Sequence, residues 1–290
     1  MEKYIVLEKE VGETPLVCAE NWRIQHPEYA DVPLAYAGRL DPMASGKLLV
    51  LIGDECKNQT NYHNLDKEYK FSVLFGIESD SLDVLGRLES LHERSPDWVR
   101  LGQTAKTSKS GNAEAVKKSV SKQLTLAAKS FVGPIELPYP KFSSKTVEGK
   151  PLHTWTLENR LGEIEIPTKR SEIYSLTLDG IDAIKKETLV DKALQKVNSI
   201  PKVTDPRKII GNDFRRTDIR ADWNKIENNE YVPHTFTIAT FTCTASSGTY
   251  MRTLASEIAK KVDTYGLAWS IHRTTIGRYN PTEKDWGLKF

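Results

Sequence analysis

The feature that most constrains this chain is a tight loop that runs directly into an apolar stretch. Residues 37–46 read AGRLDPMASG, and residues 47–53 read KLLVLIG. A short apolar run that ends at a glycine is typical of a buried strand. Asp41, which is followed by Pro42, would then lie in the loop at the lip of that strand. A carboxylate held in this way is a candidate nucleophile.

The composition is that of a soluble globular protein that can bury a substantial core. The chain has 290 residues, of which 39% are hydrophobic and 28% are charged. The chain has 41 Lys and Arg residues and 39 Asp and Glu residues, so its net charge is only +2. Any contact with nucleic acid must therefore depend on a local patch of positive charge. Cys18, Cys56 and Cys243 are widely spaced, which excludes a disulfide framework and a zinc knuckle.

The N-terminus carries no sign of a targeting segment. Its first residues, MEKYIVL, are too few and too charged for a signal peptide, and no apolar run approaches the length of a membrane span. We therefore expect a cytoplasmic protein that has no membrane partner.

The hydrophobic patterns predict both strands and helices. Strands are expected at residues 4–7, 47–52, 69–75, 172–178 and 235–243, and helices at 17–26, at 113–131 and after Gly248. The last helix is amphipathic, and the hydroxyl groups before it could cap its N-terminus: Ser246, Ser247 and Thr249. The expected fold class is α+β, with a central mixed, mostly antiparallel sheet flanked by helices.

Two polar segments interrupt these patterns. Residues 102–121 look like a flexible insertion that leads into a helix. Residues 181–234 carry several arginines around aromatic residues, which suits either a solvated loop, the favoured interpretation, or a grip on a phosphate backbone.

Three further segments accompany the loop at Asp41. Residues 67–86 begin KEYKF, residues 140–152 read PKFSSKTVEGKPL, and residues 246–254 read SSGTYMRTL. In this order and at these separations, the four segments resemble the TruB family of pseudouridine synthases. Members of that family carry a GxLDPxAxG loop, a KxY strand, a YSAxKxxG segment and an SxGTYIR helix start. The resemblance spans about residues 12–280.

The resemblance implies a fold, a substrate and a reaction. It implies the pseudouridine synthase fold with a catalytic cleft, acting on tRNA, most simply at uridine 55 of the T-stem-loop. In this reaction the N1-glycosidic bond of uridine breaks, the uracil turns over, and the ring rejoins the sugar through C5. No redox step is needed, so neither a metal ion nor an organic cofactor is expected.

The resemblance also assigns candidate site residues. Asp41 matches the catalytic aspartate, Arg252 the arginine that pairs with it, and Tyr69 the tyrosine that stacks on the target uracil and is a candidate proton acceptor at C5. The expected substrate-binding residues are Tyr36, Arg39, Lys145, Tyr250 and Ile271, the last standing where the family usually has leucine.

Several positions depart from the family pattern. Tyr36 stands where the family often has a histidine, so an aromatic face remains for base flipping but the imidazole is lost. Phe142 and His153 stand where tyrosines are usual. Thr146 occupies the position of the family lysine, with Lys145 one residue early. The RNA contacts in this segment are therefore expected to differ.

Some alternatives stay open. Asp83 could hydrogen-bond the local backbone or contact RNA. The chain stops soon after Arg278, so we expect a single catalytic domain over residues 1–290 without the PUA domain that many members carry, acting as a monomer. Two other functions compete: a pseudouridine synthase for another tRNA or rRNA site, and a tRNA-binding or folding chaperone without turnover.

Overall fold

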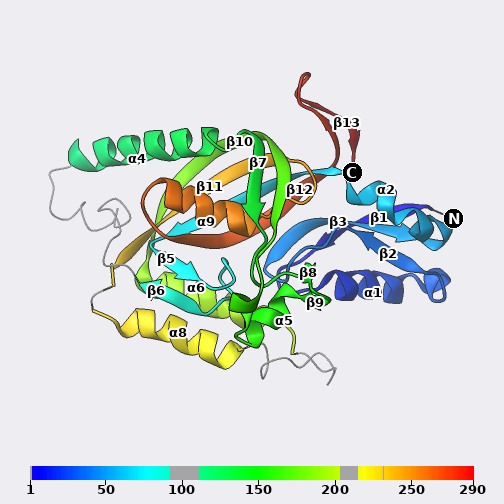
Figure 1. The fold of residues 1–290 in the computed structure, drawn as a ribbon, viewed down its shortest axis with the longest axis horizontal. Helices are drawn as coiled ribbons and strands as arrows, with labels where there is room; N and C mark the ends of the chain where they lie inside the picture. Colours follow the sequence, from blue (N-terminus) through cyan, green and yellow to red (C-terminus); the bar gives the residue numbers. More distant parts are fainter. Residues whose placement is uncertain (1, 92–110, 203–214, 231) are drawn as a thin grey trace.

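Most strands of the chain join one large sheet. A computed structural model describes residues 2–91, 111–202, 215–230 and 232–290 (Figure 1). The strands are β1 (Tyr4–Lys9), β2 (Leu34–Ala37), β3 (Ala44–Ile52), β4 (Asp66–Phe75), β5 (Ile77–Ser79), β6 (Leu88–Leu91), β7 (Gly133–Pro138), β8 (Thr146–Val147), β9 (Lys150–Pro151), β10 (Thr168–Lys185), β11 (Thr235–Ala245), β12 (Gly266–Asn280) and β13 (Asp285–Lys289). The helices are α1 (Pro15–Gln25), α2 (Gln59–His63), α4 (Gly111–Lys129), α5 (Leu152–Leu157), α6 (Lys186–Ser199), α8 (Arg216–Asn228) and α9 (Met251–Lys261), with short 3₁₀ turns at Pro27–Tyr29, Gly53–Asn58 and Leu161–Glu163.

The large sheet is mixed, and all but one of its pairings are antiparallel. Its nine strands run in the order β1-β3-β12-β4-β11-β10-β7, with β2 paired to β3 and β13 paired to β12. The exception is the parallel pairing of β3 with β12, where Ala44 lies opposite Ile271. The loop that carries Asp41 enters the sheet at this parallel junction. The predicted α+β class, with a mixed, mostly antiparallel sheet flanked by helices, is confirmed.

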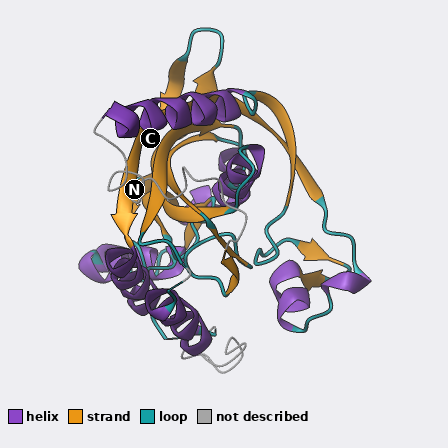
Figure 2. Ribbon diagram, turned by 90° about the vertical axis from the view of Figure 1, so that its left-hand side faces the viewer, coloured by secondary structure: helices purple, strands orange, loops and turns teal. Residues whose placement is uncertain are grey.

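Helices cover the sheet in separate groups. Apolar residues of α4, α6, α8 and α9 share one large core with β4, β11 and β12, whereas α1 packs on β3 in a smaller core of its own. Figure 1 shows α9 over the middle strands, α4 beside β10, and α1 below β1, β2 and β3. Figure 2 shows the small unit around α5 standing beside the sheet. Within the described ranges, no helix is long and apolar enough to cross a membrane.

The predicted elements compare closely with these bounds. The strands expected at 4–7, 47–52, 69–75, 172–178 and 235–243 are present as β1, β3, β4, β10 and β11, and the three expected helices as α1, α4 and α9. Because Tyr69, Phe71, Val73 and Phe75 alternate with other residues, the sequence predicts a half-buried strand there. In the structure, residues 71–75 are buried on both faces, because β4 is a central strand packed below α9.

The prediction that a hydroxyl group caps the N-terminus of α9 is wrong. Tyr250 is the N-cap residue, and its side chain accepts no capping hydrogen bond. The candidate hydroxyls have other partners: Ser246 Oγ accepts from the Glu172 N–H at 2.8 Å, and Ser247 Oγ donates to the His63 carbonyl at 2.5 Å. Thr249 donates to the Ser246 carbonyl. The first two contacts tie the loop before α9 to β10 and to the end of α2, and the third lies within the loop.

Segment 181–234 is more ordered than a solvated loop. Where the structure describes it, it contains the end of β10 and the helices α6 and α8, and Trp223 of α8 is fully buried. The basic residues Arg207 and Lys208 lie outside the described residues, as do residues 102–110 of the other polar segment. Residues 111–121 form the first part of α4.

Candidate active site

The loop at Asp41 is anchored by buried neighbours on both sides. Leu40 and Met43 are buried in the large core, whereas the side chain of Asp41 is 43% exposed. The Ala44 N–H donates to the Asp41 carbonyl at 2.9 Å, which closes the turn immediately before β3. The carboxylate is thus presented outwards from a loop whose apolar side chains hold it to the core.

The end of β1 fastens the same loop. The Gly12 N–H donates to the Pro42 carbonyl at 2.8 Å, and Lys9 Nζ donates to the Ala44 carbonyl at 2.5 Å. Lys9 is fully buried, and burial lowers its pKa to about 8. On the strand side, Gly46 has a φ of +106° and lies so close to the backbone of Arg273 that a Cβ would be 2.3 Å from its carbonyl oxygen. The loop therefore requires glycine at this position.

The carboxylate of Asp41 faces the guanidinium of Arg252. Arg252 Nε lies 2.8 Å from Asp41 Oδ2, and the arginine side chain is only 4% exposed. The Nε–H is not aimed closely enough at an acceptor to form a hydrogen bond, so the contact is an ion pair without an aligned donor. The ion pair therefore joins two residues far apart in the sequence.

Backbone carbonyls orient the other side of this guanidinium. Arg252 Nη1 donates to the Ser81 carbonyl at 2.9 Å, and Nη2 donates to the Phe142 carbonyl at 3.1 Å. Burial opposes the positive charge, but the carboxylates of Asp41 and Asp83 outweigh it and raise the pKa of Arg252. Arg252 is therefore a fixed, permanently charged partner for Asp41.

Asp83 lies behind this pair. It is 4% exposed, its Oδ2 is 3.7 Å from Arg252 Nη1, and its Oδ1 accepts from the Ser81 hydroxyl at 2.6 Å and the Leu85 N–H at 2.9 Å. Burial raises the pKa of Asp83, although Arg252 opposes the shift. Of the two interpretations left open for Asp83, these contacts favour the local backbone bond.

Tyr69 lies on the sheet face that α9 covers. A Cβ at Gly266 would contact both Ala259 of α9 and the side chain of Val73, so Val73 points towards α9. The register of β4 with β11 is regular from residue 67 to 74, so Tyr69 shares the face of Val73. Tyr69 packs, partly buried, against the same core as Leu40.

Ile271 joins the two halves of the site. In β12 it pairs with Ala44 of β3 on one side and with Phe71 of β4 on the other. It is 6% exposed and belongs to the same core as Leu40 and Tyr69. The strand order thus places Ile271 between the Asp41 loop and the strand of Tyr69.

Three more of the expected substrate-binding residues lie near the Asp41–Arg252 pair: Tyr250, Lys145 and Arg39. The rings of Tyr250 and Tyr139 meet edge to face at 5.4 Å, and Lys145 Nζ lies 5.4 Å above the Tyr139 ring. Burial, with Tyr139 and Asp41 nearby, raises the pKa of Tyr250. Arg39 donates to the Ser144 hydroxyl at 3.3 Å, which links the Asp41 loop to this segment.

Tyr36 lies in a different environment. It is in β2 opposite Val50, and its side chain packs against the smaller core formed by α1 and β3. Its carbonyl accepts from the Gln59 amide at 2.9 Å. The structure therefore places Tyr36 in the α1 core and Tyr69 in the large core.

The arrangement offers nucleophilic and electrostatic chemistry. A half-exposed carboxylate is paired with a buried cation, and aromatic side chains lie nearby on the same face of the sheet. In the part of the chain that the structure describes, no three His, Cys, Asp or Glu side chains group closely enough to hold a metal ion. What the residues present can supply is a nucleophile with a fixed counter-charge.

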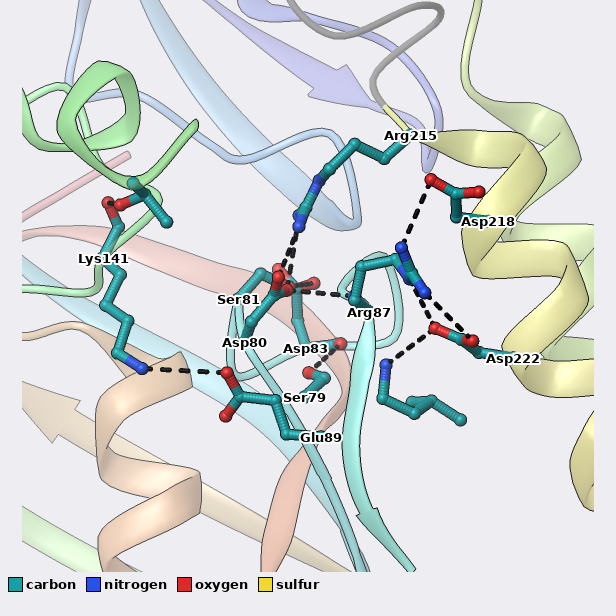
Figure 3. Close-up of polar contacts among 12 residues, drawn as sticks. Ser79, Asp80, Ser81, Asp83, Arg87, Glu89, Lys141, Arg215, Asp218 and Asp222 are labelled. Carbon is teal, nitrogen blue, oxygen red and sulfur yellow. Dashed lines mark hydrogen bonds and ion pairs between the residues drawn. The ribbon is translucent and has the colours of Figure 1, made fainter. Parts of the chain in front are cut away.

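Several residues around Arg252 were not anticipated as part of the site. The Ser81 and Phe142 carbonyls reach Arg252 from segments that are distant in the chain. Arg215 contacts the ring of Phe142 and forms an ion pair with Asp80, the residue before Ser81 (Figure 3 shows the pair with Asp80). A guanidinium that donates to backbone carbonyls leaves no mark on the identity of the accepting residues. The resemblance therefore pointed to the segments that contain Ser81 and Phe142, but not to the role of their carbonyls.

Comparisons with known proteins agree on one family. Residues 32–98 match the TruB family pseudouridylate synthase (N terminal domain). The tRNA pseudouridine synthase B of Novosphingobium aromaticivorans is 25% identical over 282 residues, which cover 96% of this chain and 68% of that protein. The protein of the same name from Caldicellulosiruptor saccharolyticus is 24% identical over 247 residues, which cover 85% of this chain and 59% of that protein.

Other similarities cover less or are more distant. The tRNA pseudouridine synthase B of Borreliella burgdorferi is 31% identical over 143 residues, 49% of this chain and 42% of that protein. A chain in the crystal structure of a Cbf5-Nop10-Gar1 complex superposes with a TM-score of 0.48 at 13% identity, covering 95% of this chain and 49% of that one. The chain thus spans only part of the length of the relatives it matches. The family match and the two relatives that extend over most of this chain show that it is similar to the TruB family of pseudouridine synthases.

Proposed function

We propose that this protein is a tRNA pseudouridine synthase that isomerises a uridine of the T-stem-loop, namely uridine 55. The observation that carries the proposal is the ion pair between Asp41 and Arg252 at 2.8 Å, in a loop fastened to the core. The relatives named tRNA pseudouridine synthase B support tRNA as the substrate.

In the proposed mechanism, Asp41 is the nucleophile. Its carboxylate bonds to C1′ of the ribose as the bond from C1′ to N1 of the base breaks, the uracil turns over, and C5 then bonds to C1′ and displaces the carboxylate. C5 loses its proton, and N1 gains one. Arg252 orients the carboxylate of Asp41, because it is itself fixed by two carbonyls and by Asp83.

Tyr69 is proposed as the platform for the detached uracil and as the proton acceptor at C5. Its position on the face below α9, in the same core as Leu40, supports this role. Ile271 and Tyr250 are proposed to wall the pocket, and Arg39 and Lys145 to contact the RNA backbone. Tyr36 is proposed as an aromatic contact for the RNA loop. We further propose a single catalytic domain, acting as a monomer in the cytoplasm.

The test maps the product at nucleotide resolution. Wild type, Asp41→Ala and the control Asp54→Ala are incubated with a full-length tRNA transcript and with an isolated T-stem-loop, and pseudouridine is located by chemical labelling and primer extension. Asp54 is a matched control because its side chain is 94% exposed and its salt bridge to Lys57 is on the surface.

Each outcome decides between the functions. Conversion of uridine 55 by wild type and Asp54→Ala, but not by Asp41→Ala, supports the proposal. Pseudouridine at another position, and not at uridine 55, would show that the enzyme has a different target nucleotide. If wild type binds and refolds tRNA without forming pseudouridine, the protein is a chaperone. Equal conversion by Asp41→Ala rejects Asp41 as the nucleophile.

A further inference from the structure

The orientation of Arg252 depends on two separate segments of backbone. Its Nη1 donates to the Ser81 carbonyl, which lies in the turn after β5, and its Nη2 donates to the Phe142 carbonyl, which lies in the segment after β7. A change in the distance between these two segments would rotate or shift the guanidinium. Some feature of the fold must therefore keep the two carbonyls at a fixed distance from each other.

One side chain contacts both segments. Arg215, at the N-terminus of α8, forms an ion pair with Asp80, the residue before Ser81, and its Nη2 donates to Asp80 Oδ1 at 3.3 Å (Figure 3). The same guanidinium lies over the ring of Phe142, with Cζ 4.2 Å from the ring centroid. Arg215 thus joins the neighbour of one acceptor to the side chain of the other.

Arg215 is itself held in place by α8. Trp223 of this helix is buried and donates from Nε1 to the Val84 carbonyl at 3.2 Å. Asp222 accepts from Arg87 Nε at 2.6 Å and from the Leu88 N–H at 3.3 Å, which fixes the helix to the β5–β6 hairpin (Figure 3). Helix α8 is therefore anchored to the hairpin that also contains Ser81. The backbone of Arg215 is fixed relative to that hairpin, and its side chain extends towards Phe142.

The local environment strengthens these contacts. The side chains of Arg215 and Asp80 are 20% and 13% exposed, so solvent screens their attraction less than it would on the surface. Arg215 has a φ of +61°, a left-handed conformation that a non-glycine residue adopts only where the surroundings impose it. Its guanidinium is engaged at one edge by a carboxylate and on one face by an aromatic ring.

We infer that Arg215 is a positioning residue for the Asp41–Arg252 pair: it clamps the two segments whose carbonyls orient Arg252. The inference rests on the proposed function for its rate measurement. The alternative for Arg215 is a direct contact with an RNA phosphate, which the arginine-rich composition of this segment also suits. The two roles differ because a positioning residue changes the rate of the chemical step and leaves RNA affinity unchanged.

The experiment compares single-turnover rates with RNA affinities. The variants are Arg215→Gln, Arg215→Lys, Asp80→Asn and the double variant Arg215→Gln/Asp80→Asn. The control is Arg220→Gln, on the same helix, where the arginine contacts Asn198 at the surface. A thermal melt of each variant verifies folding, and Arg215→Lys keeps the charge if Arg215→Gln does not fold.

We expect Arg215→Gln and Asp80→Asn each to lower the single-turnover rate about tenfold, because a small displacement of a catalytic group is costly. The dissociation constant for the RNA should stay within about twofold of wild type. The double variant should be no slower than the slower single variant, because both remove one link. Arg215→Lys should recover part of the rate, and Arg220→Gln should match wild type.

Other results would overturn the inference. Rates within about twofold of wild type for both single variants would show that the clamp does not matter. A loss of RNA affinity equal to the loss of rate would make Arg215 an RNA contact. A double variant slowed by the product of the two single effects would show that the residues act separately.

A second readout does not depend on activity. In ¹⁵N-labelled protein, the Nε–H signal of Arg252 is assigned by its loss in Arg252→Lys and then followed in Arg215→Gln. A shifted or broadened signal supports the clamp, and an unchanged signal overturns it. If wild type forms no pseudouridine, the proposed function fails, and this signal still decides the inference.

Discussion

The carboxylate of Asp83 lies 3.7 Å from Arg252 Nη1, and both side chains are almost completely buried. Arg252 therefore contacts two carboxylates: that of Asp41, which solvent reaches, and that of Asp83, which is buried. The buried carboxylate restrains the guanidinium from behind, and the accessible one is available to substrate. This division explains how one arginine can be both a structural group and part of the candidate site.

The first prediction concerns the pH dependence that Asp83 imposes. Burial raises the pKa of Asp83 in the folded state, so the folded protein holds this proton more tightly than the unfolded chain. The resulting stability is fully present below the unfolded pKa of about 3.9 and is lost as pH rises through the folded pKa. Urea unfolding of wild type and Asp83→Asn between pH 4 and 7 measures this. The advantage of wild type over Asp83→Asn should shrink as pH rises, and an advantage that grows would contradict the prediction.

The second prediction concerns Lys9. Burial lowers its pKa to about 8, whereas the unfolded value is about 10.4, so between these values the folded protein binds fewer protons. The free energy of unfolding of wild type should therefore rise with pH over this window, and Lys9→Met should remove this contribution. Unfolding at pH 8, 9 and 10 should show the difference between the two proteins increasing in favour of wild type. A constant difference would show that Lys9 is not perturbed.

The third prediction concerns the glycine where β3 begins. Gly46→Ala should lower the free energy of unfolding by about 3 kcal/mol or more, because its Cβ would collide with the backbone of Arg273 at a positive φ. The matched control is Gly180→Ala in β10, where a Cβ would meet nothing within 4 Å. Chemical denaturation measures both variants. Equal stability of the two would mean that the close approach is not rigid.

The fourth prediction separates two roles of Tyr69. Tyr69→Phe keeps an aromatic ring but loses the hydroxyl, so it should bind RNA normally and fail to remove the C5 proton. Tyr69→Leu should lose the stacking surface as well and weaken RNA binding by about tenfold, the value of one base–aromatic stack. Binding and single-turnover assays measure both effects. A fully active Tyr69→Phe would leave Tyr69 with a stacking role only.

The sequence predicted those parts of the fold that depend on local patterns. The strand at 47–52 follows from an unbroken apolar run, and the helix after Gly248 from apolar residues at helical spacing. The strand β12 was missed, because residues 266–280 mix apolar residues with Ser270, His272, Arg273 and Arg278, and the sheet buries Arg273 despite its charge.

The helices of segment 181–234 were missed although a signal was present. Leu189, Ala193 and Val197 recur every four residues and are all buried, and Ile219 and Trp223 repeat the pattern in α8. The many charged residues between them favoured a solvated loop. Overall polarity therefore concealed a narrow apolar stripe, which is enough to hold a helix against a core.

The candidate site was only partly predictable. The resemblance to a family brought Asp41, Tyr69 and Arg252 together from distant segments, which no local pattern could do. The groups that fix Arg252 are backbone carbonyls and a clamp from α8, and these depend on how segments pack in three dimensions. Such contacts become visible only in a structure.

The most direct test of the central claim, that Asp41 is the nucleophile, follows the proton at C5. RNA that carries tritium at C5 of uridine releases it to water when C5 bonds to the sugar, so tritium release measures turnover. Wild type, Asp41→Asn and the surface control Asp54→Asn are compared under single-turnover conditions. We expect complete release by wild type and Asp54→Asn, and release slowed by at least about 1,000-fold for Asp41→Asn. Release by Asp41→Asn at the rate of wild type would contradict it.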